Sequence, residues 1–334
     1  ATGARPALPP IPGLAAVAHL THATLFSLTE LPRRLGVVGS GPIGCEMAQA
    51  FARFGAEVVL VTGQRGVLPR EDRDAAARVR SALEADGVRI VGGSRELRVA
   101  PVPEGIQLHP GGGRPATVDR LLVATGRAAN VEGLGLEEAG VEFDGAGVKV
   151  DDHLRTSNRR IYAGGDVCSP HPFTHAADFM ARLVVRNALF GGRERFSGLD
   201  IPRCTYTSPE LAQVGVTAGT AETGGEAIDT FTQELAQVDR AVVDGATPGF
   251  VRVHVSRGTD RIVGATVVGD HAGEWIGELA LAMKTGAGLR TLGATIHPYP
   301  TQAEAIRRLG DQYQRGRLTP WMKGWLARWM AWRR

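Results

Sequence analysis

The 334-residue sequence predicts an α/β fold with a parallel sheet in its first half and a separate α+β domain in its last third. Two short apolar runs, residues 35–38 and 56–61, flank a segment with helical apolar spacing, which is typical of a strand–helix–strand unit. Residues 250–256 and 261–269 alternate around Gly258 and predict an antiparallel hairpin. The chain is longer than one hydrophobic core usually serves, so we expect two or three domains.

The remaining elements follow from local patterns in chain order. A helix is predicted for residues 71–85, and a strand for residues 121–124. Residues 159–167 predict a strand that ends in Gly164-Gly165-Asp166, and a helix is expected for residues 176–189. In the last third, a helix at residues 274–285 precedes the stretch HPYPTQAE, residues 297–304.

Composition excludes several classes of protein. The net charge is +3 and the pI is about 9.0, but no sustained basic run precedes the C-terminus, so we expect no nucleic-acid partner. No apolar run approaches the length of a membrane span. The three cysteines, Cys45, Cys168 and Cys204, lack metal-ligand spacing, which predicts no metal site and three buried or half-buried thiols in a reducing, cytoplasmic compartment.

The glycines of GSGPIG, residues 39–44, each have a physical role in a dinucleotide-binding turn. Gly39 permits the tight turn, Gly41 lets a pyrophosphate approach the backbone, and Gly44 lets the helix pack on the strand. The helix that begins here would direct its N-terminus at the phosphates. Because strands and helix surround the motif, the sequence favours dinucleotide binding over an ordinary glycine-rich turn.

The end of the second strand bears on the choice of nucleotide. An acidic residue there would bind the ribose hydroxyls of NAD, but this chain has Thr62, with Arg65 three residues later. This arrangement favours NADP, although Arg65 could instead be a solvated surface residue.

HPYPTQAE combines a structural signal with candidate catalytic groups. Thr301 and Glu304 have the spacing of a capping box, which predicts that Thr301 is the N-cap of a helix. His297 and Tyr299 would then project from a rigid, proline-containing loop.

The C-terminal segment, residues 319–334, predicts an amphipathic helix with Thr319 as N-cap and Pro320 at its first position. One face carries four aromatic side chains, Trp321, Trp325, Trp329 and Trp332. The helix is short, which favours packing on its own domain or on a partner subunit; the alternative is weak contact with a membrane surface.

Taken in order, ATG, GxGxxGxE, ATGR, AGGD, TSPE-x-A-x-VG and HPxPTxxE resemble the class I pyridine nucleotide-disulfide oxidoreductase family. Its members include dihydrolipoamide dehydrogenase, glutathione reductase and mercuric reductase. The matching segments are residues 1–3, 39–46, 124–127, 164–166, 207–215 and 297–304.

The resemblance implies a Rossmann-like NAD(P)-binding domain inserted in a partial FAD-binding domain and followed by an α+β dimerisation domain. It assigns residues 1–34 and 128–197 to the FAD-binding domain and residues 35–127 to the NAD(P)-binding domain. Residues 198–318 form the dimerisation domain, and residues 319–334 the tryptophan-rich helix.

The same resemblance implies roles for individual residues. Asp166 would bind the FAD ribityl chain, Glu46 would lie near the nicotinamide, and Gly126 near the NAD(P) phosphates or ribose. Further cofactor-binding residues would be Thr2, Gly3, Ile43, Arg127, Pro172, Phe173, Thr174 and His175. Hydride would pass from NADPH or NADH to FAD, and electrons from there to an acceptor.

Two departures from the family pattern shape the functional expectation. The family's first GxGxxG and its CxxxxC redox pair do not occur in these residues, so we expect a piece of a longer enzyme that, alone, binds FAD weakly or not at all and is inactive. Disulfide-reducing members carry His at the position of Tyr299, paired with the residue matching Glu304. Mercuric reductase carries Tyr there, but its C-terminal cysteine pair is replaced here by Trp and Arg.

We therefore expect a homodimeric, mercuric reductase-like flavoenzyme with a small-molecule or metal-ion acceptor. Tyr299, Glu304 and His297 would be its catalytic residues, acting across the subunit interface. The alternatives are a dihydrolipoamide dehydrogenase-like disulfide oxidoreductase and a non-catalytic nucleotide-binding or membrane-associated module.

Overall fold

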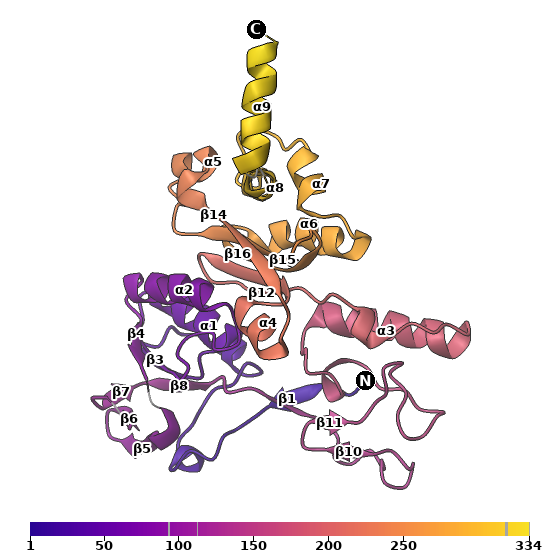
Figure 1. Cartoon of the computed structure of the whole chain (residues 1–334). Helices are drawn as coiled ribbons and strands as arrows, with labels where there is room; N and C mark the ends of the chain where they lie inside the picture. The colour runs from indigo at the N-terminus through magenta and orange to yellow at the C-terminus, as the bar shows by residue number, and fades with distance from the viewer. Residues whose placement is uncertain (93, 112, 318–319, 334) are drawn as a thin grey trace. The chain divides into compact units, whose positions relative to one another are not determined.

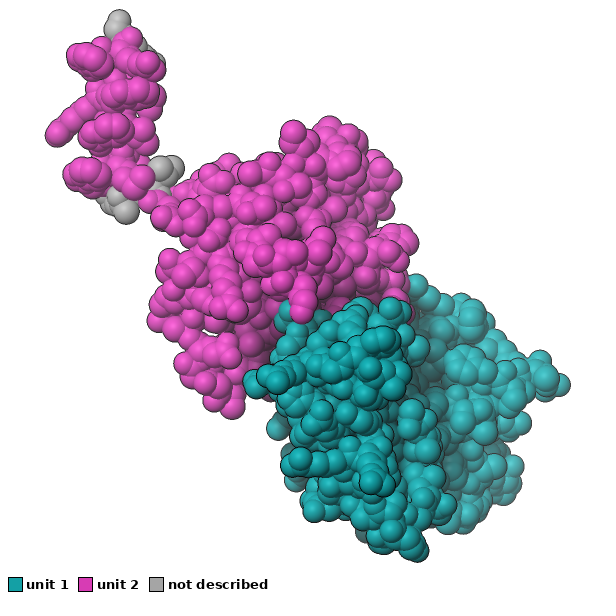
Figure 2. Space-filling model, turned by 90° about the vertical axis from the view of Figure 1, so that its right-hand side faces the viewer, with its two compact units in different colours: residues 1–69, 83–201 teal, residues 70–82, 202–334 magenta. Residues whose placement is uncertain are grey.

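The computed structural model describes residues 1–92, 94–111, 113–317 and 320–333 (Figure 1). The chain divides into two compact units (Figure 2). Unit 1 contains residues 1–69 and 83–201, and unit 2 contains residues 70–82 and 202–334. A short segment from the first half of the sequence therefore belongs with the C-terminal third.

Unit 1 contains a four-stranded parallel sheet with the order β4-β3-β2-β8. Its strands are β2 (Arg34–Val38), β3 (Glu57–Val61), β4 (Arg89–Val91) and β8 (Arg120–Val123). Helix α1 (Pro42–Arg53) connects β2 to β3, as a parallel pair requires. The predicted strand–helix–strand unit is confirmed, with bounds that differ by one residue.

A smaller antiparallel sheet completes the core of this part of unit 1. It has the order β5-β6-β7 and consists of β5 (Arg98–Val102), β6 (Gly105–His109) and β7 (Ala116–Val118). Leu108 and Val118 of this sheet share a buried cluster with Val38 and Val61 of the parallel sheet. Burial of apolar side chains from both sheets therefore holds this part of unit 1 together.

The remainder of unit 1 contains two antiparallel ribbons and a helix. Strand β1 (Ala4–Pro6) pairs with β9 (Arg127–Ala129), and β10 (Phe143–Asp144) pairs with β11 (Gly147–Val148). Helix α3 (Thr174–Leu189) begins two residues before its predicted start. The two ATG segments thus precede strands that pair with each other.

The predicted strand at residues 159–167 is wrong. Among the described residues of this segment, only Tyr162 makes a β-bridge, an isolated antiparallel one with Arg155. Gly165–Val167 forms a 3₁₀ turn in which Gly165 has a φ of 77°. A ladder needs successive paired residues, and the left-handed glycine ends the extended chain before they can form.

Unit 2 is built on a five-stranded antiparallel sheet with the order β12-β13-β16-β15-β14. Its strands are β12 (Arg203–Thr205), β13 (Glu210–Gly215), β14 (Ile228–Glu234), β15 (Phe250–Ser256) and β16 (Ile262–Gly269). The hairpin of β15 and β16 confirms the prediction made from their alternating pattern.

Helices α6 (Ala272–Thr285) and α8 (Glu304–Gly316) contribute Leu279, Ile306 and Leu309 to the buried core of unit 2. The other helices are α2 (Arg73–Ala85), α4 (Ala218–Gly224), α5 (Asp239–Val243), α7 (Leu289–Ala294) and α9 (Pro320–Trp332). The predicted helix at residues 319–334 is confirmed over α9. Thr319, its predicted N-cap, lies outside the described residues.

A polar row crosses the sheet of unit 2. Neighbouring strands pair its members in the order Arg203, Gln213, Thr266, Arg252, Thr232. Carboxylates of the segment 70–82 neutralise the two arginines: Glu71 lies 2.9 Å from Arg203, and Asp72 lies 2.9 Å from Arg252. These ion pairs explain why the segment 70–82 belongs to unit 2.

Candidate functional site

The glycine turn between β2 and α1 has one open position and two crowded ones. A side chain at Gly39 would collide with the carbonyl oxygen of Ala124, and the φ of 107° is itself strained for other residues. A Cβ at Gly44 would collide with the carbonyl oxygen of Gly39. At Gly41, a Cβ would meet nothing within 4 Å. Gly39 and Gly44 thus shape the turn, and Gly41 leaves space beside it.

The first turn of α1 presents backbone donors next to that space. Gly41 is the N-cap, makes no side-chain capping bond, and is followed by Pro42 and the half-buried Ile43. Backbone N–H groups at a helix N-terminus carry partial positive charge and bind phosphates. The turn therefore fits the pyrophosphate of a dinucleotide. Glu46 lies in the second turn of α1 and is half-buried.

The two residues expected to select the nucleotide have different surroundings. Thr62 is buried, and its N–H donates to the carbonyl oxygen of Val91 at 2.8 Å. Arg65 is exposed. Its loop is held against the glycine turn because the Ser40 hydroxyl donates to the carbonyl oxygen of Gly66 at 2.7 Å. Of the two side chains, Arg65 is the one accessible to a ligand.

A second group of predicted residues lines one hollow of about 520 Å³ in unit 1. Gly3, Arg127, Asp166, Pro172 and Thr174 all contribute to its wall. The sequence places these residues up to 171 positions apart, from Gly3 to Thr174. The fold therefore brings together most of the residues expected to bind FAD.

The ribbon of β1 and β9 positions one side of this hollow. The Thr2 hydroxyl donates to the carbonyl oxygen of Asn130 at 2.8 Å, and the Asn130 N–H donates to the carbonyl oxygen of Gly3 at 2.9 Å. Gly126 has a φ of 132°, and its carbonyl oxygen accepts from Ala7 at 3.0 Å. Thr2 and Gly126 thus hold the ribbon, whereas Gly3 and Arg127 face the hollow.

Asp166 lies on the 3₁₀ turn that follows two glycines. Its Oδ2 lies 3.2 Å from Nε of Arg127, and the Asp166 side chain is 13% exposed. The N-terminal residue of α3, Thr174, is exposed beside it. Phe173 and His175 stack on each other with ring centroids 5.4 Å apart and do not occur among the described lining residues. A charged pair and a helix N-terminus fit the polar part of a flavin nucleotide.

His297 ties the HPYPTQAE segment to α6. Its side chain is 7% exposed, and Nε2 lies 3.0 Å from Oε1 of Glu278. Its Nδ1 lies 3.1 Å from the carbonyl oxygen of Thr295. Both ring nitrogens therefore have protein partners, which indicates a structural role.

Tyr299 is the exposed member of the segment. Its side chain projects from the corner, with the residue 70% exposed, and its hydroxyl donates to Oδ2 of Asp239 at 3.1 Å. The hydrogen bond to the Asp239 carboxylate raises the pKa of Tyr299 above its ordinary value. The phenol is therefore a hydrogen-bond donor at neutral pH rather than a base.

Glu304 is buried and ionised. Its Oε1 accepts from Arg307 at 2.9 Å and from Arg308 at 3.3 Å, while Oε2 is buried with no partner among the described residues. Burial by itself would raise the pKa of Glu304, but hydrogen bonds from the two arginines hold that pKa below its ordinary value. Arg308 also lies 3.7 Å from Asp239, which connects Glu304 indirectly to the partner of Tyr299.

The predicted capping box is wrong. Helix α8 begins at Glu304 with Ala303 as N-cap, and no side chain caps it. The Thr301 hydroxyl donates to the carbonyl oxygen of Pro298 at 2.7 Å. Thr301 thus stabilises the proline corner, because the chain is still turning for two more residues before the helix begins.

All three cysteines are free and buried or half-buried, as predicted. Burial raises the pKa of Cys45 to about 12 and the pKa of Cys168 to about 11. Cysteine chemistry depends on the thiolate, so these two thiols are unsuited to nucleophilic attack at neutral pH.

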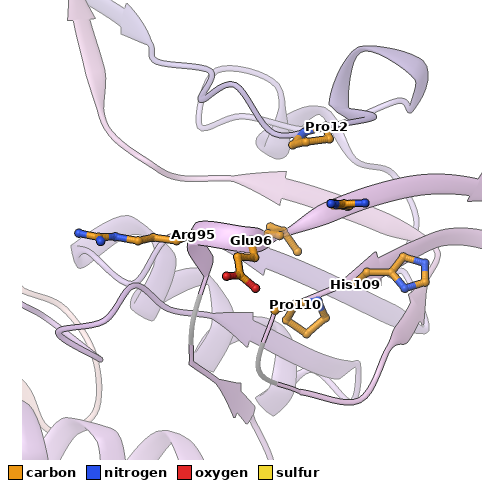
Figure 3. A pocket seen from close by; sticks show the side chains of 8 residues that line it. Pro12, Arg95, Glu96, His109 and Pro110 are labelled. Atoms are coloured by element: carbon orange, nitrogen blue, oxygen red, sulfur yellow. The ribbon is translucent and has the colours of Figure 1, made fainter.

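Another hollow, of about 480 Å³, lies on the antiparallel sheet of unit 1. Figure 3 shows Pro12 on one side of it and Pro110 on the other. Its described lining residues include Arg95, Glu96 and His109, and none of the predicted site residues. It carries charges of both signs and no recognisable chemical arrangement.

Three contacts of the HPYPTQAE segment were missed by sequence reasoning. Asp239 lies 60 positions before Tyr299 on the short helix α5, Glu278 lies on α6, and Arg308 lies one turn into α8. Only Arg308 had a local signal, because residues four apart on a helix are neighbours.

Comparison with known families supports the arrangement of both units. Residues 1–219 match the pyridine nucleotide-disulphide oxidoreductases, and residues 201–309 match the dimerisation domain of the same family. Members of this family are FAD-dependent and use NAD(P)H. The predicted fold class is confirmed: α/β cofactor-binding regions are followed by a dimerisation domain.

Individual relatives give the degree of similarity. A mercuric reductase from Streptomyces lividans is 37% identical over 311 residues, which are 92% of this chain and 65% of the relative. A dihydrolipoyl dehydrogenase from Thermus scotoductus is 35% identical over 287 residues, 84% of this chain and 62% of the relative. The chain thus spans 65% and 62% of the length of these two curated relatives.

A solved structure extends the match to three dimensions. The HOCl-induced flavoprotein disulfide reductase RclA from Escherichia coli superposes with a TM-score of 0.86 at 31% identity, covering 93% of this chain and 72% of that one. Together with the family matches to residues 1–219 and 201–309, this similarity shows that the chain belongs to the pyridine nucleotide-disulphide oxidoreductase family.

Proposed function

We propose that this chain is part of a homodimeric, FAD-dependent NAD(P)H oxidoreductase of the mercuric reductase-like kind, with a small-molecule or metal ion as electron acceptor. The observation that carries this proposal is the exposed Tyr299 hydroxyl, which donates a hydrogen bond to Asp239. Disulfide-reducing members of the family carry His at this position. The dimerisation domain supports the homodimer.

The residues that would hold the cofactors lie in unit 1. Gly41 and the N-terminus of α1 would bind the NAD(P) pyrophosphate, and Arg65 would bind the 2′-phosphate of NADPH. Asp166, Gly3 and Thr174 would contact FAD in the hollow that they line. When bound, the two cofactors supply hydride and electron transfer.

The corner would place a protonated phenol beside two carboxylates, Asp239 and Glu304. Tyr299 is protonated at neutral pH, and Asp239 raises its pKa further. Hydrogen bonds from Arg307 and Arg308 keep the Glu304 carboxylate ionised. A dithiol–disulfide exchange needs a group that takes and returns a proton near neutral pH, which a His does and a Tyr with a raised pKa does not. This chemistry argues against a disulfide as the natural electron acceptor.

The test uses the full-length protein with FAD bound. We expect NADPH to bleach the flavin absorbance, and Tyr299→Phe to lower turnover with the acceptor by at least about tenfold, without slowing bleaching. Acceptors to compare are Hg²⁺, Cu²⁺, a quinone and lipoamide. Equal turnover of the wild type and Tyr299→Phe with every acceptor would contradict the proposed role of Tyr299.

The dihydrolipoyl dehydrogenase-like alternative is supported by the 35% identity to that relative. Two variants separate it from the main proposal. If the wild type reduces lipoamide and Tyr299→His does so no faster, the dithiol function holds. If only Tyr299→His gains lipoamide activity, Tyr299 is what directs the natural enzyme to another acceptor.

A further inference from the structure

Helix α9 carries a face of exposed aromatic side chains. Trp321, Trp325, Trp329 and Trp332 are separated by four, four and three positions, so all four lie on one side of the helix. Their exposed fractions run from 39% to 83%. Met322 and Met330 are exposed as well, but each directly follows a tryptophan and therefore points away from this face. Aromatic side chains contribute a large apolar area to a contact when they become buried. This exposed face therefore has the composition of a contact surface.

The rings on this face are already ordered by one another. Trp325 and Trp329 stack with centroids 6.4 Å apart and an interplanar angle of 8°. The guanidinium of Arg333 lies 4.7 Å from the centre of the Trp329 ring. A cation beside an indole face keeps its charge available while its stem covers apolar surface.

The charge of this region has a single sign. After Asp311 the sequence contains no Asp or Glu, whereas Lys and Arg occupy positions 315, 317, 323, 328, 333 and 334. Lys323 and Arg328 are exposed on α9. The helix therefore combines tryptophans with cations and lacks acidic residues that would neutralise them.

We propose that α9 lies in the interface of an anionic lipid membrane. The tryptophan rings would occupy the boundary between headgroups and acyl chains, where Trp is enriched, and the cations would contact anionic phosphates. A spanning helix needs about 20 mostly apolar residues, and α9 has 13 residues in all. Among the described residues, no helix meets the length and hydropathy needed to cross a bilayer, so α9 would lie on the surface.

Charge favours a membrane over a second copy of the helix as the occupant of this face. Two copies of α9 facing each other would bring Arg328 and Arg333 of one chain toward those of the other, and like charges at close range repel. An anionic lipid surface instead attracts each of these residues. The charge of α9 thus outweighs its short length, which by itself favours packing on its own domain or on a partner subunit.

The test uses tryptophan fluorescence and vesicle sedimentation. The chain has five tryptophans, and Trp275→Phe leaves four, all on α9. We expect a blue shift of the emission and co-sedimentation with vesicles of phosphatidylcholine and phosphatidylglycerol at 3:1, and neither with phosphatidylcholine alone. The substitutions Lys323→Gln, Arg328→Gln and Arg333→Gln together should weaken partitioning about 100-fold.

A control removes three cations from α3 and from the loop that follows it. Arg182→Gln, Arg186→Gln and Arg193→Gln change the net charge by the same amount and should leave vesicle binding within about threefold. Equal loss from both triple variants would show that net charge, not α9, drives binding and would overturn the proposal. The proposal is also wrong if anionic vesicles cause no blue shift, or if Trp325→Ser with Trp329→Ser converts a dimer to a monomer in lipid-free buffer.

Discussion

At the scale of the residue, Gly41 and Gly44 differ in what a side chain would meet, although both belong to one motif. A Cβ at Gly41 would meet nothing within 4 Å, and its backbone has an ordinary φ of −74°. A Cβ at Gly44 would collide with backbone. Substitution by alanine therefore tests nucleotide binding at Gly41 and folding at Gly44.

We expect Gly41→Ala to keep its melting temperature within about 2 °C and to raise the Kd for NADPH at least about tenfold, because a methyl group would occupy the space left for the pyrophosphate. Gly44→Ala should unfold several degrees lower, since the helix must move away from the turn. Calorimetry and a fluorescence titration with NADPH measure the two effects. A Gly41→Ala variant with wild-type affinity would show that the phosphate binds elsewhere.

Tyr299 and Asp239 allow a second residue-scale prediction. The Asp239 carboxylate raises the pKa of Tyr299, so Asp239→Asn should lower it toward the ordinary value of about 10. The phenolate absorbance of the wild type minus that of Tyr299→Phe isolates this titration. Asp244→Asn is the control, because Asp244 contacts Arg240 and Gln302 instead. An unchanged titration in Asp239→Asn would show that the hydrogen bond does not persist in solution.

At the scale of the element, β15 contains a buried titratable group. His254 is fully buried, its Nδ1 lies 2.9 Å from the Thr230 hydroxyl, and burial lowers its pKa to about 4, with Arg252 opposing and Asp72 favouring protonation. Between pH 6.5 and 4 the unfolded chain binds a proton that the folded chain excludes. The contribution of His254 to stability should therefore be nearly constant above about pH 7 and should fall by up to about 3 kcal/mol on acidification to pH 4.

Urea unfolding at several pH values measures this loss. His254→Gln should be less stable at pH 7 but should lose less stability on acidification than the wild type. Thr230→Val removes the hydrogen bond and keeps the titrating ring, so its stability should fall with the same pH slope as that of the wild type. If His254→Gln and the wild type share one slope, other groups cause the acid sensitivity.

Elements also show what the sequence could predict. The strands of the parallel sheet and the β15–β16 hairpin follow from apolar runs and alternation, which are local patterns. The strand predicted at residues 159–167 was wrong because a β-ladder needs a paired neighbouring strand. Among the described residues of this segment, only Tyr162 makes a β-bridge. The predicted start of α8 was wrong because the Thr301 hydroxyl donates backward to the carbonyl oxygen of Pro298. The T-x-x-E spacing does not reveal this contact.

The candidate site divides in the same way. Gly39, Gly41 and Gly44 were recognisable because their roles are backbone roles within six residues. Asp239 was not recognisable, because its contact with Tyr299 depends on how α5 is placed against a loop 60 positions later. Long-range side-chain partners are set by packing, so a single sequence leaves them open.

At the scale of the whole molecule, the segment 70–82 joins a unit whose other residues begin at position 202. The pair of Asp72 and Arg252 carries this association, with side-chain exposures of 4% and 15%. Asp72 also accepts from the N–H groups of Asp74 and Ala75, so it caps α2 at the same time. Removing one partner of a buried pair leaves the other charge uncompensated.

We expect Asp72→Ala to lower the free energy of unfolding by about 3–5 kcal/mol, through the lost ion pair and the lost cap. Arg252→Met should cost less, because Asp72 keeps its two backbone donors. The double variant should be more stable than the sum of the two losses implies, by at least about 1 kcal/mol. The exposed pair of Arg182 and Asp178, at 60% and 53%, is the matched control and should couple by less than about 0.5 kcal/mol. Equal coupling of the two pairs in urea unfolding would mean that the segment 70–82 is held to unit 2 by its apolar residues rather than by charge.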